Sequence, residues 1–155
     1  MTQADSPAAR KRAVLLVTCG AAFLFPFMGS SVNVALPSVG AELHMSAVEL
    51  AWVATSFLLT SSLLLVPFGR LGDMRGRKRV LVTGVGIYAI GSAIAGASQT
   101  GTMLIVARAV QGSGGAMLAS TAVAILVSAH GPGERGKVLG INAAALYSGL
   151  SVGPA

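Results

Sequence analysis

The sequence predicts an all-α membrane protein with several spans, and three observations support this fold class. Hydrophobic residues make up 54% of the chain, whereas charged residues make up only 10%, against roughly 25% in soluble domains. The charges lie in clusters that are separated by apolar runs of about 20 residues, the length at which an α-helix crosses a bilayer. This number of charged residues is too small to cover the surface of a water-soluble domain. We therefore expect a bundle of about five transmembrane helices.

The first two spans are expected at residues 13–37 and 50–68. Residues 1–12 are polar and small and are predicted to form a tail outside the membrane. The first apolar run is much longer than the 7–15 residues of a signal-peptide core, so we expect this span to be retained. Trp52 lies near one end of the second span, where an indole ring favours the membrane interface.

The remaining spans are expected at residues 80–97, 102–128 and from 138 onward. A short turn separates the third from the fourth, and a Gly- and Pro-containing loop precedes the fifth. No polar anchor follows the fifth run, which reaches the last residue, Ala155. A terminal carboxylate inside the hydrocarbon layer would be costly, so we expect the fifth span to be truncated and the chain to be a fragment.

The basic residues predict the orientation of these spans. Ten of the eleven lie before the first span, between the second and third, or between the fourth and fifth: Arg10, Lys11, Arg12, Arg70, Arg75, Arg77, Lys78, Arg79, Arg135 and Lys137. Cytoplasmic loops carry such an excess, so we expect a cytoplasmic N-terminus in a plasma or inner membrane. Because these charges flank apolar runs instead of forming one basic face, the net charge of +6 does not indicate a nucleic-acid partner.

The connection between the second and third spans, residues 69–79, reads GRLGDMRGRKR and contains the first group of candidate site residues. Its glycines permit a tight reversal, and its acid can cap a helix or pair with arginine. A plain loop that follows the positive-inside rule is the alternative. The candidate gating residues are Gly69, Gly72, Asp73, Arg75, Gly76, Arg77 and Lys78.

The fourth span contains Arg108 and Gln111, which are three residues apart and share one helix face. A guanidinium within a membrane span must face a cavity or a polar partner. Arg108 is therefore either a cavity-lining residue or a structural hydrogen-bonding centre. The small residues that follow, Gly112 and Gly115 among them, leave room for another backbone to approach.

Two further patterns lie in the fifth and first spans. Gly149 and Gly153 have the GxxxG spacing of packed membrane helices, and Pro154 is expected to bend the helix. Asn33, within a span, needs a hydrogen-bond partner. It could line a cavity or simply bond to a neighbouring helix.

Residues 69–79 closely resemble the signature loop of the major facilitator superfamily, and they lie between the second and third spans as in that family. The resemblance implies that Gly69, Asp73 and Arg77 belong to a charge relay that latches two halves of a transporter, the second of which is missing here. Residues 108–116 resemble the family's fourth-span motif, whose arginine is linked to proton coupling.

The first span resembles a motif of the family's drug:proton antiporter branch, whose members have fourteen spans. The fifth resembles the opening of a glycine-proline motif that is typical of the family's antiporter-type exporters, of which only the first part is present. Met28 stands where that branch usually has an acid. The resemblance implies proton-coupled efflux of drugs or other small molecules by alternating access. Uptake of a sugar or an organic anion and a non-transporting, truncated scaffold are the alternatives.

The sequence contains no metal-binding or nucleophile–base motif of an enzyme. We therefore expect neither catalysis nor a cofactor nor a metal. The expected partners are the lipid bilayer, a small-molecule substrate, protons as the coupling ion, and the missing C-terminal half of the same transporter.

Overall fold

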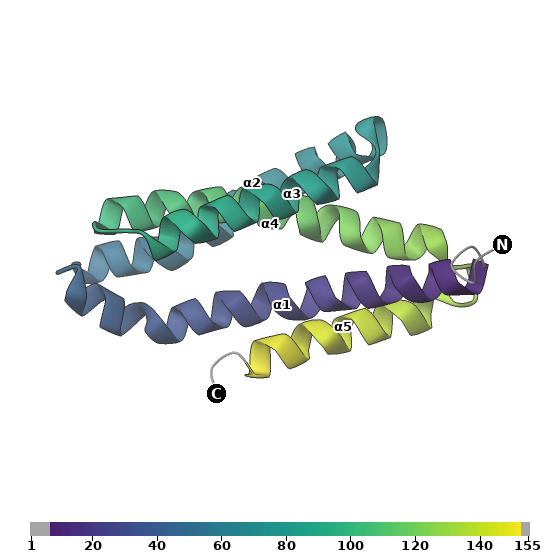
Figure 1. Ribbon diagram of the computed structural model, residues 1–155, viewed down its shortest axis with the longest axis horizontal. Coiled ribbons are helices and arrows are strands. Elements are labelled where there is room, and N and C mark those ends of the chain that lie inside the picture. The colour runs from purple at the N-terminus through teal and green to yellow at the C-terminus, as the bar shows by residue number, and fades with distance from the viewer. Residues whose placement is uncertain (1–6, 153–155) are drawn as a thin grey trace. The chain divides into compact units, whose positions relative to one another are not determined.

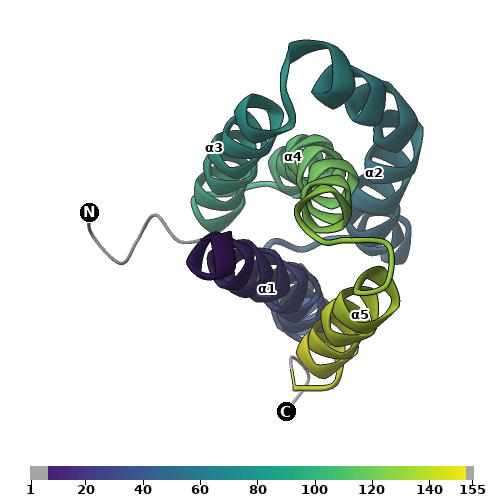
Figure 2. The same cartoon turned by 90° about the vertical axis from the view of Figure 1, so that its right-hand side faces the viewer.

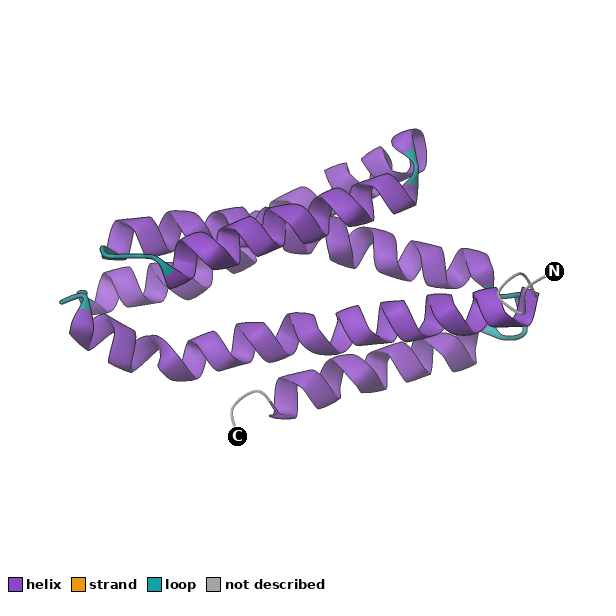
Figure 3. Ribbon diagram, in the orientation of Figure 1, coloured by secondary structure: helices purple, strands orange, loops and turns teal. Residues whose placement is uncertain are grey.

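The computed structural model describes residues 7–152, and this part of the chain is helical throughout apart from short connections (Figure 1, Figure 3). The helices are α1 (Pro7–Glu42), α2 (Ala47–Arg75), α3 (Arg77–Gly96), α4 (Gly101–Ala129) and α5 (Arg135–Val152). The predicted all-α class and the five helices are confirmed.

Four of the helices are long and apolar enough to cross a membrane, namely those at Lys11–Glu42, Ala47–Arg75, Arg77–Gly96 and Gly101–Ala129. Helix α5 has 18 residues and is not among them. Arg135 and Lys137 occupy its first turn and lower the hydropathy of a helix this short.

The connection between α1 and α2 is shorter than predicted. The predicted spans, residues 13–37 and 50–68, leave residues 38–49 between them, but only residues 43–46 lie outside the two helices. Ser46 starts α2 with a capping box: its hydroxyl accepts the Glu49 N–H at 3.3 Å, and the Glu49 carboxylate accepts the Ser46 N–H at 2.8 Å. The prediction was wrong because it treated charged residues as loop residues, although a helix can continue past the apolar layer.

Two further predicted boundaries differ for the same reason, whereas the predicted fourth span, residues 102–128, agrees with α4 to within one residue at each end. Helix α1 begins at Pro7, within the predicted tail of residues 1–12, of which residues 1–6 lie outside the described part. The predicted loop at 69–79 is almost entirely helical, since α2 continues to Arg75 and α3 starts at Arg77. Gly76 alone separates them, and its φ of 98° lies in the left-handed region that favours glycine.

The chain divides into two compact units, one made of Val32–Thr121 and the other of the residues up to Ser31 with those from Ala122 onward. In the first unit, α4 lies between α2 and α3 (Figure 2). A Cβ added to Gly112 would lie 2.6 Å from the Phe57 carbonyl oxygen of α2. A Cβ added to Gly114 would lie 2.6 Å from the Tyr88 nitrogen of α3. Glycines on opposite faces therefore allow α4 to touch both neighbouring backbones.

In the second unit, the first part of α1 runs alongside α5 (Figure 1). A Cβ on Gly149 would collide with the carbonyl oxygen of Phe23. The Ser30 hydroxyl also donates to the Leu150 carbonyl at 3.4 Å. These two helices thus pack backbone against backbone at Gly149.

The packing of α4 makes a testable prediction. Gly114→Leu should destabilise the protein by about 1–3 kcal/mol, because the added side chain must push α3 away from α4. The measurement is thermal unfolding in detergent micelles. Gly86→Leu in α3 is the matched control, since a Cβ there meets nothing within 4 Å. Equal melting temperatures for the two variants would contradict the close contact.

Candidate functional site

The Arg108 side chain of α4 lies inside the first unit and is only 3% exposed. Its Nε donates to the Val53 carbonyl of α2 at 3.4 Å, and its guanidinium lies 4.4 Å above the centre of the Phe57 ring. An aromatic face stabilises a cation without neutralising it. The two ion pairs that the described residues form do not include Arg108, so the protein around it supplies polar contacts and no counter-charge.

Gln111, one turn further along α4, connects Arg108 to α3. Its Oε1 accepts from Arg108 Nη1 at 2.9 Å, and its Nε2 donates to the Ser92 hydroxyl at 2.8 Å. Gln111 is 5% exposed, so both ends of a buried amide are paired. The sequence placed Arg108 and Gln111 on one helix face, and the structure brings them into direct contact.

Ser92, Val53 and Phe57 were not identified from the sequence. A serine in an apolar helix gives a weak signal, because serines often bond only to their own helix. The carbonyl of Val53 gives none at all, since any residue has one. The adjacent Gly91 is the feature that could have drawn attention to Ser92, because glycine in a span often marks close helix contact.

Asn33, the third predicted cavity residue, is exposed. It lies in α1 within the same unit as Arg108. The hydrogen bonds among residues 7–152 do not join it to Arg108 or Gln111. The structure therefore brings together two of the three predicted cavity residues and leaves Asn33 apart from them.

The candidate gating residues lie around the corner between α2 and α3. Both Arg77 Nε and Arg77 Nη2 donate to Asp73 Oδ1, at 3.0 and 2.9 Å. Gly72 lies against α4, where an added Cβ would be 3.1 Å from the Thr121 methyl group. Gly69 is also near α4, with Ser120 3.7 Å from such a Cβ. Arg75 and Lys78 are exposed.

The predicted packing residues are only partly described. Gly112 approaches α2 and Gly149 approaches α1, as described above, and Gly115 is buried in α4. Gly153 and Pro154 lie outside the described residues.

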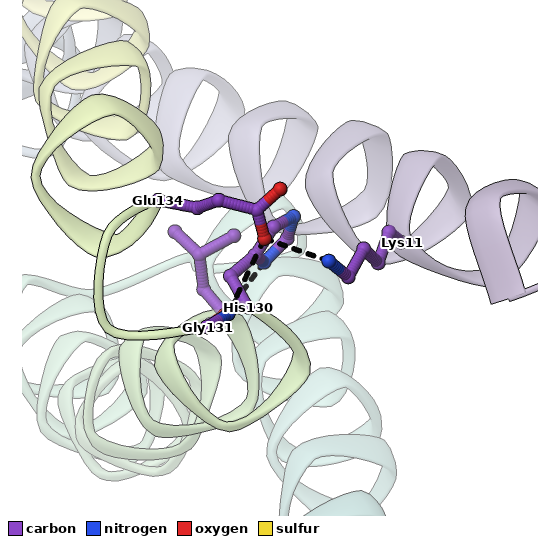
Figure 4. A network of polar contacts seen from close by, with 5 residues as sticks. Lys11, His130, Gly131 and Glu134 are labelled. Atoms are coloured by element: carbon purple, nitrogen blue, oxygen red, sulfur yellow. Dashed lines mark hydrogen bonds and ion pairs between the residues drawn. The ribbon is translucent and has the colours of Figure 1, made fainter.

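A second polar cluster joins α1 to the connection between α4 and α5 (Figure 4). Lys11 Nζ donates to Glu134 Oε2 at 2.7 Å, and the Gly131 N–H donates to the same oxygen at 3.3 Å. His130 Nδ1 lies 2.9 Å from the Leu126 carbonyl, which can only accept. The pKa of Glu134 is lowered by the Lys11 hydrogen bond first, then by the Gly131 N–H and by the charges of Lys11 and His130.

The polarity of this protein is inverted relative to that of a water-soluble bundle. Arg108, Gln111 and Thr121 are buried, whereas large apolar side chains such as Leu58 and Leu63 are exposed on the spanning helices. Apolar residues face lipid and polar residues face the protein interior in a membrane. These features define a polytopic α-helical membrane protein.

Residues 18–155 match the Major Facilitator Superfamily, and the chain belongs to that family. The chain is 40% identical to the cephamycin export protein of Amycolatopsis lactamdurans over 78% of its own length and 25% of that protein. It is 32% identical to the riboflavin transporter of Clostridioides difficile, over 94% of the chain and 32% of the relative. It is 38% identical to the puromycin resistance protein of Streptomyces alboniger, over 90% of the chain and 28% of the relative. The chain thus spans about a quarter to a third of these relatives.

The Lys11–Glu134 contact predicts a pH dependence of stability. Because the folded-state pKa of Glu134 is lowered, the contact contributes in full above the ordinary pKa of a glutamate. The contribution falls as the pH drops below that value and is lost below the folded-state pKa. Thermal unfolding from pH 7 to pH 3 should show this loss. Lys11→Met should lower the melting temperature slightly at pH 7 and by less at pH 3, and an equal effect at both pH values would contradict the assignment.

Proposed function

We propose that this chain is the N-terminal part of a secondary active transporter that exports drugs or other small molecules in exchange for protons. The observation that carries the proposal is Arg108, a buried cation within a spanning helix that has no carboxylate partner among the described residues. Intramembrane charges mark substrate and ion pathways. Relatives named for cephamycin export and for puromycin resistance support export and a drug-like substrate.

The proposed mechanism is alternating access, in which two helical bundles rock about a central site. Arg108 and Gln111 form the wall of that site in the N-terminal half, together with Asn33 from α1. The C-terminal half of the same transporter supplies the opposite wall. The protein acts as a carrier, not as an enzyme.

The corner between α2 and α3 is the proposed gate. In this proposal Asp73 and Arg77, which form an exposed ion pair, exchange partners with the C-terminal half as the bundles rock. Gly69 and Gly72 let this segment lie against α4, so its movement is coupled to the helix that holds Arg108. The positive-inside rule supports a cytoplasmic position for this basic corner in the proposal, with the N-terminus on the same side of the cell membrane.

In this proposal the proton carrier is not an acid in the middle of any described helix. The four acids of the described part, Glu42, Glu49, Asp73 and Glu134, lie at helix ends or in a connection. Arg108 keeps its proton at physiological pH, so it cannot carry one. In this proposal Arg108 lowers the pKa of an acid in the C-terminal half.

Uptake of an organic anion is the second candidate function. A buried guanidinium with unused donors is a suitable partner for a carboxylate or a phosphate on the substrate. The riboflavin transporter among the relatives shows that members similar to this chain are not all named for drug resistance. The direction of substrate movement in vesicles separates the two functions.

The experiment uses the full-length reading frame that contains this chain, expressed in bacteria that lack their own exporters. Asp73→Asn and Arg108→Ala should each reduce drug export about tenfold or more, since losing a charged hydrogen-bond partner costs about 1.5–3 kcal/mol. Drug efflux from loaded cells is measured, with membrane levels checked by immunoblot.

Arg79→Gln is the control, because it also removes a charge from the corner but is not among the proposed gating residues. It should export like the unaltered protein. Full export by both Asp73→Asn and Arg108→Ala would refute the proposed roles of these residues. Collapse of the proton gradient should stop export, and persistence of export without the gradient would refute proton coupling.

A further inference from the structure

A directed chain of hydrogen bonds connects Arg108 to the backbone of α3. Arg108 Nη1 donates to Gln111 Oε1, Gln111 Nε2 donates to Ser92 Oγ, and Ser92 Oγ donates to the Tyr88 carbonyl at 2.9 Å. We propose that Ser92 is a positioning residue, which fixes the Gln111 amide and through it the Arg108 guanidinium. This inference rests on the proposed function, because that function gives Arg108 its role in transport.

The direction of the chain follows from the chemistry of its members. A guanidinium can only donate, so the oxygen end of the Gln111 amide must face Arg108. The nitrogen end then points at α3 and needs an acceptor. The Ser92 hydroxyl directs its proton to the Tyr88 carbonyl, and this leaves its lone pairs for Gln111. Ser92 is therefore the group in α3 that satisfies the outer end of the amide.

The packing around Gln111 prevents an easy alternative. A Cβ added to Gly91 would lie 2.7 Å from Gln111 Cγ and 2.9 Å from its backbone nitrogen. The backbone of α3 at Gly91 therefore packs closely against Gln111 Cγ, so that the terminal amide is the part of the side chain that can still rotate. Because Gln111 is 5% exposed, water is poorly placed to replace a lost Ser92 hydroxyl.

The contacts with Val53, Gln111 and Phe57 hold the Arg108 guanidinium in one position. Val53 holds its Nε and Gln111 holds its Nη1, while the Phe57 ring lies beneath the guanidinium. These contacts direct the remaining donors of Arg108 toward whatever anionic group it meets during transport. Without Ser92, the amide would turn to find another acceptor and would release Nη1. Transport would then suffer although Arg108 itself is intact.

The test compares Ser92→Thr with Ser92→Val in the full-length protein, because these side chains have the same shape and differ in the hydroxyl group. Threonines in this protein already donate to the carbonyl four residues earlier, as Thr18 does to Val14 at 2.8 Å and Thr83 does to Arg79 at 3.0 Å. Ser92→Thr should therefore keep the transport rate, whereas Ser92→Val should lower it about five- to tenfold. Equal rates for the two variants, whether high or low, would overturn the proposal.

Ser61→Ala is the matched control. The Ser61 hydroxyl donates to the Gly112 carbonyl at 3.0 Å and so joins α2 to α4, but this hydrogen bond does not involve the Gln111 side chain. It should leave the transport rate unchanged. Ser92→Val should cause no further loss in a Gln111→Ala background, because it acts only through Gln111. An additive loss would show an ordinary packing role and would also overturn the proposal.

A second measurement separates this inference from the proposed function. The melting temperatures of Ser92→Val, Gln111→Ala and the double variant in detergent should be non-additive, whereas those of Ser61→Ala and Gln111→Ala should add. If Arg108→Ala transports normally but the Ser92–Gln111 coupling is present, the proposed role of Arg108 fails and the hydrogen-bond chain stands. If Arg108→Ala is inactive and the coupling is absent, Ser92 is not the positioning residue.

Discussion

The hydrocarbon layer of a membrane contains no water that could pair with a polar group, and the arrangement of α2, α3 and α4 follows from this constraint. Arg108 and Gln111 find hydrogen-bond partners in α2 and α3, so the helices on either side have to come close enough to provide them. Gly112 and Gly114 permit that approach on opposite faces of α4. The polar residues of α4 thus depend on its glycines, which let α2 and α3 come close enough to bond to them.

The contacts around Arg108 satisfy some of its hydrogen-bond donors but leave its positive charge without a counter-charge among the described residues. Hydrogen bonds from Arg108 to Val53 and Gln111, together with the Phe57 ring, reduce the cost of burying a guanidinium. None of them cancels its charge. In the proposed transporter such a site suits an anionic partner, because the guanidinium is already desolvated before that partner binds.

The first four spans and the Arg108–Gln111 pair could be predicted from the sequence, because both depend on local patterns: runs of apolar residues and a spacing of three. The ends near Glu49 and Asp73 could not be predicted, since these residues lie in helical turns that extend beyond the apolar runs. Ser92 could not be predicted either. Its role depends on which face of α3 meets α4, and this is decided by contacts between residues distant in sequence.

The corner at Gly76 has a mechanical consequence. Since only one residue separates α2 from α3, the angle between these helices depends almost entirely on two backbone torsions. Helix α3 has 20 residues and is therefore about 30 Å long, so a rotation of about 10° at its base would move its far end by about 5 Å. A rotation at Gly76 would therefore displace Ser92 far more than the residues next to the corner, and the close packing of α3 on α4 at Gly91 would carry part of that displacement to α4.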